Sequence, residues 1–262
     1  MTDFNTITLA TDTRGITTVT LNRPEKHNAM NAEMIAELMQ AAREVAADDD
    51  VRAVILAASG KSFCAGADLG WMQAQAERDR SGKMAEGRAL ADMLAALNRL
   101  PKPLIARVQG SVYGGGIGLI SVADIIVAVE DVRFGLTETK LGLIPATIGP
   151  FVVRRMGEGF ARQVFFTGKG FGTDLALRSS LVTRTCKAGE LDGLMEEEVA
   201  AVLKCAPGAV AAAKGLCQKL GGAELATFTG ETVEALADRW ESEEAQEGIK
   251  AFFAKEKPSW IV

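Results

Sequence analysis

The chain has 262 residues, 48% of them hydrophobic and 24% charged, so it carries enough apolar sequence to bury a sizeable core. Its 29 basic and 34 acidic side chains give a net charge of -5, which excludes the overall basic field that attracts nucleic acid. Four cysteines at no metal-ligand spacing and a single histidine also argue against a metal site built by the protein.

We expect no targeting signal in the amino-terminal residues. Residues 1–5 lack the basic and apolar segments of a signal sequence, and no apolar run in the chain is long enough to cross a bilayer. We therefore expect a cytoplasmic protein whose partners include neither a membrane nor a nucleic acid.

The first half of the chain predicts strands that alternate with helices. Two strands joined by a hairpin-type turn come first, and apolar residues from Met34 to Ala46 then recur at helical spacing. In order, the pattern predicts strands at 7–9 and 15–21, a helix ending before 48–50, a strand at 51–57, a polar loop at 73–83, a helix at 84–98, and strands at 104–109 and 124–129. This alternation indicates a layered α/β core.

Strand signals fade after Gly149, and helical segments are predicted near residues 191–204, 208–220 and 225–237. We therefore expect residues 1–195 to form the core that holds the functional site. Residues 196–262 are expected to form an α-helical carboxy-terminal region.

Two loops of small residues follow predicted strands. Gly114, Gly115 and Gly116 precede a helix-like segment at 117–122, and bare backbone N–H groups at a helix start can hold a phosphate or a developing oxyanion. A tight turn with close packing is the alternative. The second loop, residues 62–68, opens from the strand at 51–56. Two amides that face one point would polarise a carbonyl group.

Seven segments, in order along nearly the whole chain, carry a family resemblance. They are 22–29, 63–68, 102–103, 114–116, 123–125, 134–145 and 248–255. Together they resemble the enoyl-CoA hydratase/isomerase (crotonase) family, most closely its bacterial methylglutaconyl-CoA hydratase-type members. The resemblance implies a ββα superhelix with an α-helical trimerisation part, a homotrimer or homohexamer, and an acyl-CoA substrate. No separate cofactor and no metal are implied, because coenzyme A is part of the substrate.

The resemblance also implies which groups do the chemistry. The backbone N–H groups of Ala67 and Gly115 would bind the thioester oxygen on which negative charge develops. Glu138 would be the acid/base, since a carboxylate among apolar neighbours has a raised pKa that suits proton transfer. The alternative for Glu138 is a solvated side chain paired with Lys140.

Further residues are expected to bind the substrate. By resemblance, Arg23, Lys26 and Lys255 would meet the phosphates of coenzyme A and Phe252 its adenine, with plain surface charge as the alternative. Trp71 would line or cover the acyl pocket. The whole expected binding set is Arg23, Lys26, His27, Ala29, Ala65, Gly66, Asp68, Leu69, Trp71, Gly114, Gly118, Phe252 and Lys255.

Three residues that invite a catalytic role are interpreted differently. Asp68 is expected to cap a helix that starts near Leu69, and Asp124 to fix the start of a strand. His27, the only histidine, is expected to pack against ligand or backbone and not to act as a base.

One position departs from the family pattern. The best-known hydratases carry a second catalytic glutamate two residues after the third glycine, where this chain has Gly118. A hydratase would then need the distal carboxylate of the substrate, or ordered water in the space that Gly118 leaves, to hold the attacking water. A cation from Arg78, Arg80 or Lys83 would pair with such a carboxylate. The alternatives are a delta-3 to delta-2 enoyl-CoA isomerase with one glutamate and a degenerate acyl-CoA-binding family member.

Overall fold

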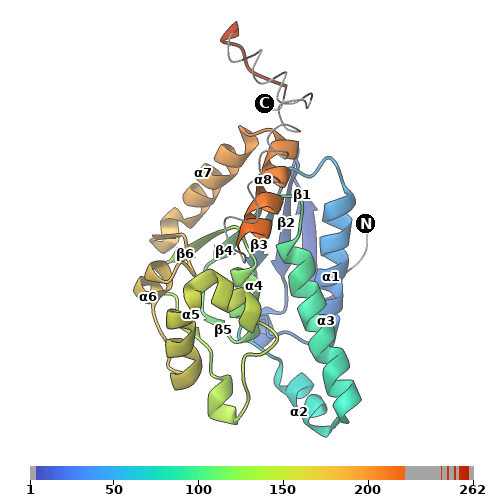
Figure 1. Cartoon of the computed structure of the whole chain (residues 1–262), viewed down its shortest axis with the longest axis vertical. Coiled ribbons are helices and arrows are strands. Elements are labelled where there is room, and N and C mark those ends of the chain that lie inside the picture. The colour runs from blue at the N-terminus through green and yellow to red at the C-terminus, as the bar shows by residue number, and fades with distance from the viewer. Residues whose placement is uncertain (1–3, 222–242, 244–246, 248–250, 252–253, 260–262) are drawn as a thin grey trace.

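The structure is a computed structural model that describes residues 4–221, 243, 247, 251 and 254–259. Its main sheet has the strand order β1-β2-β3-β4-β6-β8, and β1 and β2 are antiparallel while all other neighbours are parallel (Figure 1). These strands are β1 (Ile7–Thr11), β2 (Ile16–Leu21), β3 (Ala53–Ala58), β4 (Leu104–Val108), β6 (Ile125–Val129) and β8 (Arg184–Cys186). A second, parallel pair is formed by β5 (Val112–Tyr113) and β7 (Phe134–Gly135). The expected α/β class is confirmed.

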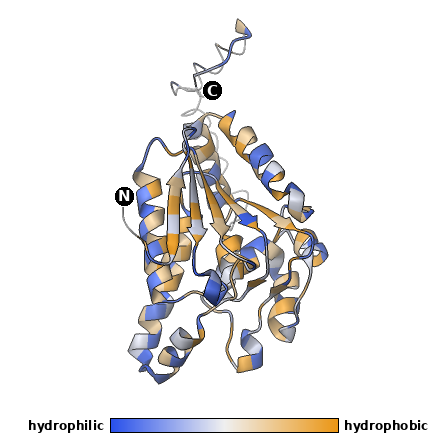
Figure 2. Cartoon of the chain, turned by 180° about the vertical axis from the view of Figure 1, so that it is seen from behind, coloured by the Kyte–Doolittle hydropathy of each residue, from blue (hydrophilic) through white to orange (hydrophobic). Residues whose placement is uncertain are grey.

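The central strands are hydrophobic because they are covered on both faces. In β3, β4 and β6 almost every side chain is buried, as is typical of parallel strands between helical layers. Figure 2 shows these strands as the most continuous hydrophobic part of the molecule. The loops of the candidate site follow the carboxyl ends of these strands.

Eight α-helices surround the two sheets in the described part of the chain. They are α1 (Ala32–Ala47), α2 (Leu69–Glu77), α3 (Arg80–Asn98), α4 (Gly115–Ser121), α5 (Gly149–Thr167), α6 (Thr173–Arg178), α7 (Leu191–Leu203) and α8 (Pro207–Leu220). Short 3-10 turns are η1 (Pro24–Lys26), η2 (Glu138–Leu141) and η3 (Ala188–Glu190). Helices α1 and α3 lie side by side against one side of the sheet, and α5, α6 and α7 lie on the opposite flank (Figure 1).

Helix α1 illustrates how the sequence specifies an element. Asn31 caps it, since its side-chain oxygen accepts a hydrogen bond from the Met34 N–H at 2.9 Å. The buried residues then form a single apolar stripe: Met34, Ile35, Leu38, Ala41, Ala42 and Val45. The predicted helix is confirmed, and so is the predicted hairpin, in which Ile7 pairs with Leu21.

Two sequence expectations about elements are wrong. Residues 73–83 are not a polar loop, because α2 continues to Glu77 and α3 begins at Arg80. Asp79 separates the two helices and caps α3 by accepting from the Gly82 N–H at 2.8 Å. The polarity of this stretch therefore reflects exposed helix faces. Strands also do not end at Gly149, since β8 adds a three-residue edge strand beside β6.

Both described carboxy-terminal helices occur where they are predicted, as α7 and α8, while residues 225–237 lie outside the described residues. The expected boundary at residues 195 and 196 falls within α7, whose Leu191, Met195 and Val199 belong to the main hydrophobic core. The division into two regions stays a prediction.

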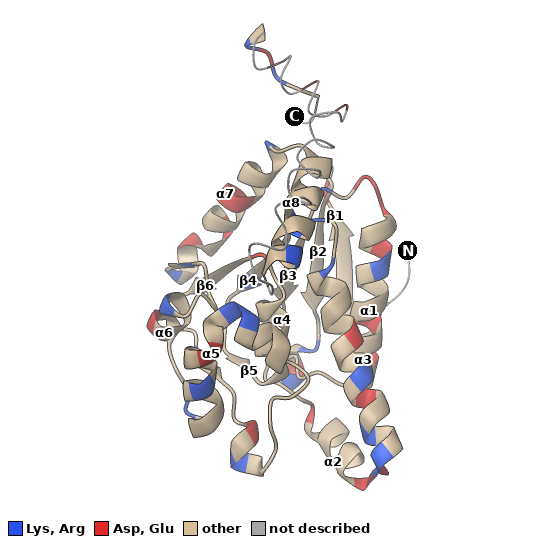
Figure 3. Cartoon of the chain, viewed as in Figure 1, with Lys and Arg blue, Asp and Glu red and all other residues tan. Residues whose placement is uncertain are grey.

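Charges of both signs are spread over the helices, without a continuous basic face in the view of Figure 3. Within the described residues, no single helix is long and apolar enough to span a membrane. A pair bent by 102°, residues 188–203 and 207–220, meets the length and composition test only when taken together.

Candidate active site

Three loops meet beyond the carboxyl ends of β2, β3 and β4, which is where open parallel sheets bind ligands. Backbone hydrogen bonds join them in sequence. The Ala65 N–H donates to the His27 carbonyl at 3.0 Å, and the Tyr113 N–H donates to the Cys64 carbonyl at 2.9 Å. The two small-residue loops are therefore held next to each other by main-chain contacts.

Asn28 fixes the conformation of the loop that follows β2, residues 22–30, which is called the first loop below. Asn28 is fully buried and has a left-handed backbone, with φ at 53°, which asparagine tolerates better than most residues. Its side-chain oxygen accepts from the Arg23 N–H at 2.8 Å, and its amide nitrogen donates to the carbonyls of Ser59 and Ser62. Sequence reasoning missed this residue, although an asparagine within a turn-rich segment is a recognisable signal.

The two amides expected to bind an oxyanion have no partner in the described part of the chain. The N–H groups of Ala67 and Gly115 donate no hydrogen bond to any described residue. On either side of Ala67, by contrast, the Gly66 carbonyl accepts from the Met30 N–H at 2.7 Å, and the Asp68 N–H donates to the Met30 carbonyl at 2.8 Å. Because unpaired amides are costly unless water or a ligand meets them, these two are candidate ligand donors.

Glycine is required where the loops touch. Gly66 and Gly114 have φ values of 96° and 48°, a region that other residues rarely adopt. A Cβ at Gly114 would lie 3.6 Å from the Gly66 Cα, so the two loops approach backbone to backbone. A Cβ at Gly116 would lie 2.8 Å from the Cys64 Cβ, and a larger residue would push the loops apart.

Glu138 faces the same place. A Cβ at Gly114 would lie 3.4 Å from Glu138 Oε1, and Glu138 Oε2 is buried with no hydrogen-bond partner among the described groups. Burial raises the pKa of this carboxyl above its ordinary range. The neighbouring Thr139 hydroxyl donates to the Phe165 carbonyl at 2.9 Å and ties η2 to α5. A solvated ion pair with Lys140 is not formed, although both residues are described.

Gly118 leaves no room for ordered water. A Cβ at this position would lie 2.5 Å from Ile148 Cγ2 and 2.9 Å from Ile148 Cβ, with Leu94 Cδ1 at 3.5 Å. Both neighbours are almost fully buried. The expectation of a water network in the space beside Gly118 is therefore wrong, because an isoleucine side chain fills that space.

Asp68 caps α2 as predicted. Its Oδ1 accepts from the N–H groups of Gly70 and Trp71, and its Oδ2 pairs with the Arg23 guanidinium at 3.1 Å. These hydrogen bonds, first that from Trp71, lower the pKa of Asp68 below its ordinary value. Arg23 also donates to the Ala29 carbonyl at 2.7 Å, so its side chain stiffens the loops that surround the site.

A polar cluster lies where α2 meets α3. The indole N–H of Trp71 donates to Glu86 at 3.2 Å, and Glu86 also pairs with Arg78 at 3.1 Å. One turn after Trp71, the Gln75 side-chain nitrogen is buried without a partner among the described groups. Leu69, at the start of α2, is 78% exposed. The segment after Glu138 lies close to α3, since a Cβ at Gly87 would lie 3.9 Å from the Thr147 hydroxyl oxygen.

Three further residues expected to bind the substrate, Lys26, His27 and Lys255, are exposed. His27 and Lys26 are exposed on the first loop, and the His27 ring nitrogen lies 3.1 Å from the Ser62 hydroxyl. Lys255 is exposed, whereas Phe252 lies outside the described residues.

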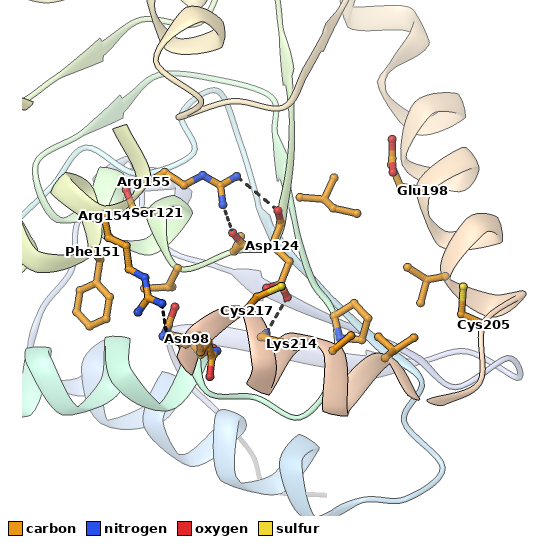
Figure 4. Close-up of a pocket in the computed structure, with 18 of the residues that line it drawn as sticks. Asn98, Ser121, Asp124, Phe151, Arg154, Arg155, Glu198, Cys205, Lys214 and Cys217 are labelled. Atoms are coloured by element: carbon orange, nitrogen blue, oxygen red, sulfur yellow. Dashed lines mark hydrogen bonds and ion pairs between the residues drawn. The ribbon is translucent and has the colours of Figure 1, made fainter. Parts of the chain in front are cut away.

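A separate cavity of about 650 Å³ lies beneath α8, at the amino-terminal ends of β4 and β6 (Figure 4). Asp124 borders it and accepts hydrogen bonds from the Leu104 N–H and from Lys214, each at 2.7 Å. This confirms that Asp124 fixes a strand start. Ala67, Gly115 and Glu138 do not line this cavity, so it is distinct from the candidate active site.

The arrangement at the carboxyl ends of the strands can bind an oxygen that gains charge. Two amides that donate to no described residue would stabilise the oxyanion, and one half-buried carboxylate is available to move a proton next to it. That combination suits proton transfer at a carbon adjacent to a carbonyl group.

Comparisons with known proteins agree with this chemistry. The chain matches the family described as Enoyl-CoA hydratase/isomerase over residues 11–261. It is 32% identical over 248 residues to the short-chain-enoyl-CoA hydratase of Clostridium acetobutylicum, covering 92% of both proteins. It is 34% identical over 252 residues to the mevalonyl-coenzyme A hydratase sidH of Aspergillus fumigatus, covering 92% of this chain and 90% of that relative. A crystal structure of an enoyl-CoA hydratase from Shewanella pealeana has a TM-score of 0.94 and 36% identity, covering 98% of this chain and 96% of the other.

Proposed function

This chain belongs to the enoyl-CoA hydratase/isomerase family of acyl-CoA enzymes, and we propose that it adds water across the C2=C3 bond of a 2-enoyl-CoA thioester. One observation carries the proposal: the half-buried carboxylate of Glu138, whose Oε2 has no hydrogen-bond partner among the described groups, lies against Gly114, close to the N–H groups of Gly115 and Ala67 that donate to no described residue. A family member that only bound acyl-CoA would have no need of a half-buried acid with an unsatisfied oxygen at this place.

The reaction can be written with these groups alone. Glu138 accepts a proton from water as the water oxygen bonds to C3, and the C2=C3 electrons move toward the thioester carbonyl. The resulting enolate oxygen receives hydrogen bonds from the Ala67 and Gly115 amides. Glu138 then returns a proton to C2, which restores its carboxylate and completes the addition.

A second candidate, delta-3 to delta-2 isomerisation, is favoured by the packing around Gly118. Ile148 and Leu94 crowd the point where the Cβ of a larger residue at position 118 would lie. Glu138 is the one acid among the described residues that borders Gly114. A single carboxylate suffices to take the C2 proton of a 3-enoyl-CoA and return it to C4. The same two amides would stabilise the dienolate.

For hydration, we infer that the substrate is branched and carries a distal carboxylate, as 3-methylglutaconyl-CoA does. With Ile148 beside Gly118, such a carboxylate is the remaining candidate for the second group that holds the attacking water. Arg78 is already paired with Glu86, whereas Arg80 and Lys83 form no ion pair with any described residue and are free to meet it. The name of the mevalonyl-coenzyme A hydratase relative is consistent with a branched acyl group.

Coenzyme A is proposed to lie along the first loop and the carboxy-terminal segment around Lys255. Lys26 is exposed beside the site, and Lys255 is exposed in the carboxy-terminal segment. Both are available for phosphate contacts, and Phe252 is proposed to lie near the adenine. Arg23 is also proposed to meet the phosphates, and its pairing with Asp68 orients the loop that is proposed to bind the thioester.

We also propose a homotrimer or homohexamer in which a neighbouring subunit covers the site. Large apolar side chains that follow the catalytic segments are exposed, among them Leu69 at 78%, Leu141 at 64% and Ile144 at 72%. Exposed apolar groups of this kind commonly mark an interface. Sedimentation at micromolar concentration should show the assembly, and deletion from Phe252 onward should weaken coenzyme A binding. A fully active monomer would contradict this proposal.

Three substrates test the reaction. The purified protein would be given crotonyl-CoA, 3-methylglutaconyl-CoA and a 3-enoyl-CoA, and absorbance of the conjugated thioester would be followed. Hydration removes this absorbance, whereas isomerisation of the 3-enoyl-CoA creates it. We expect 3-methylglutaconyl-CoA to be hydrated far faster than crotonyl-CoA. Equal kcat/KM values for the two would reject the role of the distal carboxylate, and isomerisation without hydration would identify the isomerase.

A further inference from the structure

Met30 contacts both halves of the proposed oxyanion-binding site. It lies at the end of the first loop, just before the Asn31 cap of α1, and its side chain is 3% exposed. We propose that Met30 is a positioning residue that fixes the spacing between the Ala67 and Gly115 amides. This inference rests on the proposed function, in which those two amides bind the thioester oxygen.

The main chain of Met30 holds the first amide. Its N–H donates to the Gly66 carbonyl at 2.7 Å, and its carbonyl accepts from the Asp68 N–H at 2.8 Å. These two bonds form a short parallel bridge between Met30 and Ala67. Because both neighbouring peptide groups are bonded to Met30, the intervening Ala67 N–H is turned away from it and stays free for a ligand.

The side chain of Met30 reaches the second amide. A Cβ at Gly115 would lie 2.1 Å from the Met30 Cε, and the next described atom outside α4 is the Met30 sulfur at 3.9 Å. The terminal methyl of Met30 therefore occupies the volume that a side chain at residue 115 would need. It packs against the backbone of Gly115 on the side where a side chain would otherwise project.

Methionine suits this position because it is long and unbranched. Its Cε extends one bond beyond the sulfur, so the side chain can span from the first loop to the start of α4. Leucine has a similar volume but lacks this terminal reach. Loss of the contact should let the Gly115 amide shift relative to Ala67, and a shift of about 1 Å can cost about 100-fold in rate.

The test measures carbonyl polarisation separately from folding. The coenzyme A thioester of 4-(dimethylamino)cinnamic acid absorbs at longer wavelength when its carbonyl oxygen receives hydrogen bonds. We expect wild-type protein to shift this band, and Met30→Ala and Met30→Leu to shift it less while still binding the probe. Their kcat on the preferred substrate should fall about 10- to 100-fold, with KM changing less. Met195→Ala, a buried methionine in α7, is the matched control and should leave the band shift intact.

A double variant tests the contact itself. Gly115 has no left-handed backbone, so alanine is excluded there by the Met30 methyl alone. Gly115→Ala should reduce kcat in the wild-type background. In the Met30→Ala background the new methyl group fills the vacated space, so Gly115→Ala should cause no further loss or should restore part of the band shift.

The outcomes separate the two levels of inference. If wild-type protein produces no band shift with the probe, the proposed oxyanion site is wrong. If the wild-type protein shifts the band and both Met30 variants shift it as far as wild type does, the positioning role of Met30 is wrong. Independent, additive losses in the double variant would also overturn that role.

Discussion

The Arg23 guanidinium and the Asp68 carboxylate lie 3.1 Å apart and connect the first loop to the residue that follows Ala67. The same carboxylate caps α2 through its other oxygen. One aspartate thereby fixes the loop and starts the helix, which holds the Ala67 amide from its carboxyl side as Met30 does through the main chain.

Asp68→Ala should therefore lower the free energy of unfolding by about 1–2 kcal/mol, the usual cost of a lost helix cap. Asp68→Asn keeps an oxygen that can accept from the Trp71 N–H and should cost less. Since the pKa of Asp68 is lower in the folded protein, its contribution is present above about pH 4 and is lost as pH falls through the folded value. Urea unfolding near pH 7 and near pH 3 measures this, and an equal cost of Asp68→Ala at both would contradict it.

Glu138→Gln should preserve the fold and acyl-CoA affinity but reduce turnover by about 100- to 10,000-fold, because the amide keeps the shape and removes the proton-transfer group. Steady-state kinetics on the preferred substrate provide the measurement. Glu158→Gln is the control, since Glu158 is exposed on α5 and pairs with Arg162. Retention of more than about a tenth of the activity by Glu138→Gln would remove Glu138 from the catalytic role.

The pH dependence of kcat/KM should follow the raised pKa of Glu138. The carboxylate is the form that accepts a proton, so the rate should be low in acid and rise with pH. Because burial raises this pKa, the midpoint of the rise should lie above the ordinary glutamate value of about 4.3. A rate that stays constant down to that value would show that ionisation of Glu138 does not limit the reaction.

Gly118→Ala should destabilise the protein by about 1–3 kcal/mol, because its methyl group would overlap Ile148. Ile148→Ala removes the Cγ2 atom that lies closest, so the double variant should lose less than the sum of the two single losses. Chemical denaturation of the four proteins measures the coupling. Gly159→Ala in α5, where a Cβ meets nothing within 4 Å, is the control and should not destabilise.

The sequence predicted those parts of the fold that have strong local signals. The apolar stripe of α1, the hairpin of β1 and β2, and the Asp68 cap are all specified by neighbouring residues. The prediction of a loop at 73–83 was wrong because the polar side chains there face solvent from α2 and α3. The amino-acid composition of an exposed helix face resembles that of a polar loop. The three-residue β8 is stabilised by its pairing with β6, which no local pattern reveals.

The candidate site could be predicted only in part, for a physical reason. Glycine spacing and resemblance identified the loops and Glu138, whose surroundings now account for a raised pKa. The filling of the space beside Gly118 depends on Ile148, thirty residues later in the chain and on another element. The support of Gly115 by Met30 is likewise a tertiary contact, so neither could be derived from local sequence.

The packing of Ile148 against Gly118 has a stereochemical consequence. If two amides hold the thioester as proposed, the apolar wall that Ile148 forms at Gly118 leaves Glu138 to act on the reacting carbons from one face of the acyl plane. In hydration, the hydroxyl group and the new hydrogen would then add to that same face. In isomerisation, the proton would leave C2 and return to C4 on that face. Deuterium introduced from solvent at C2 should accordingly have a single configuration, set by the side of the cleft on which the carboxylate stands.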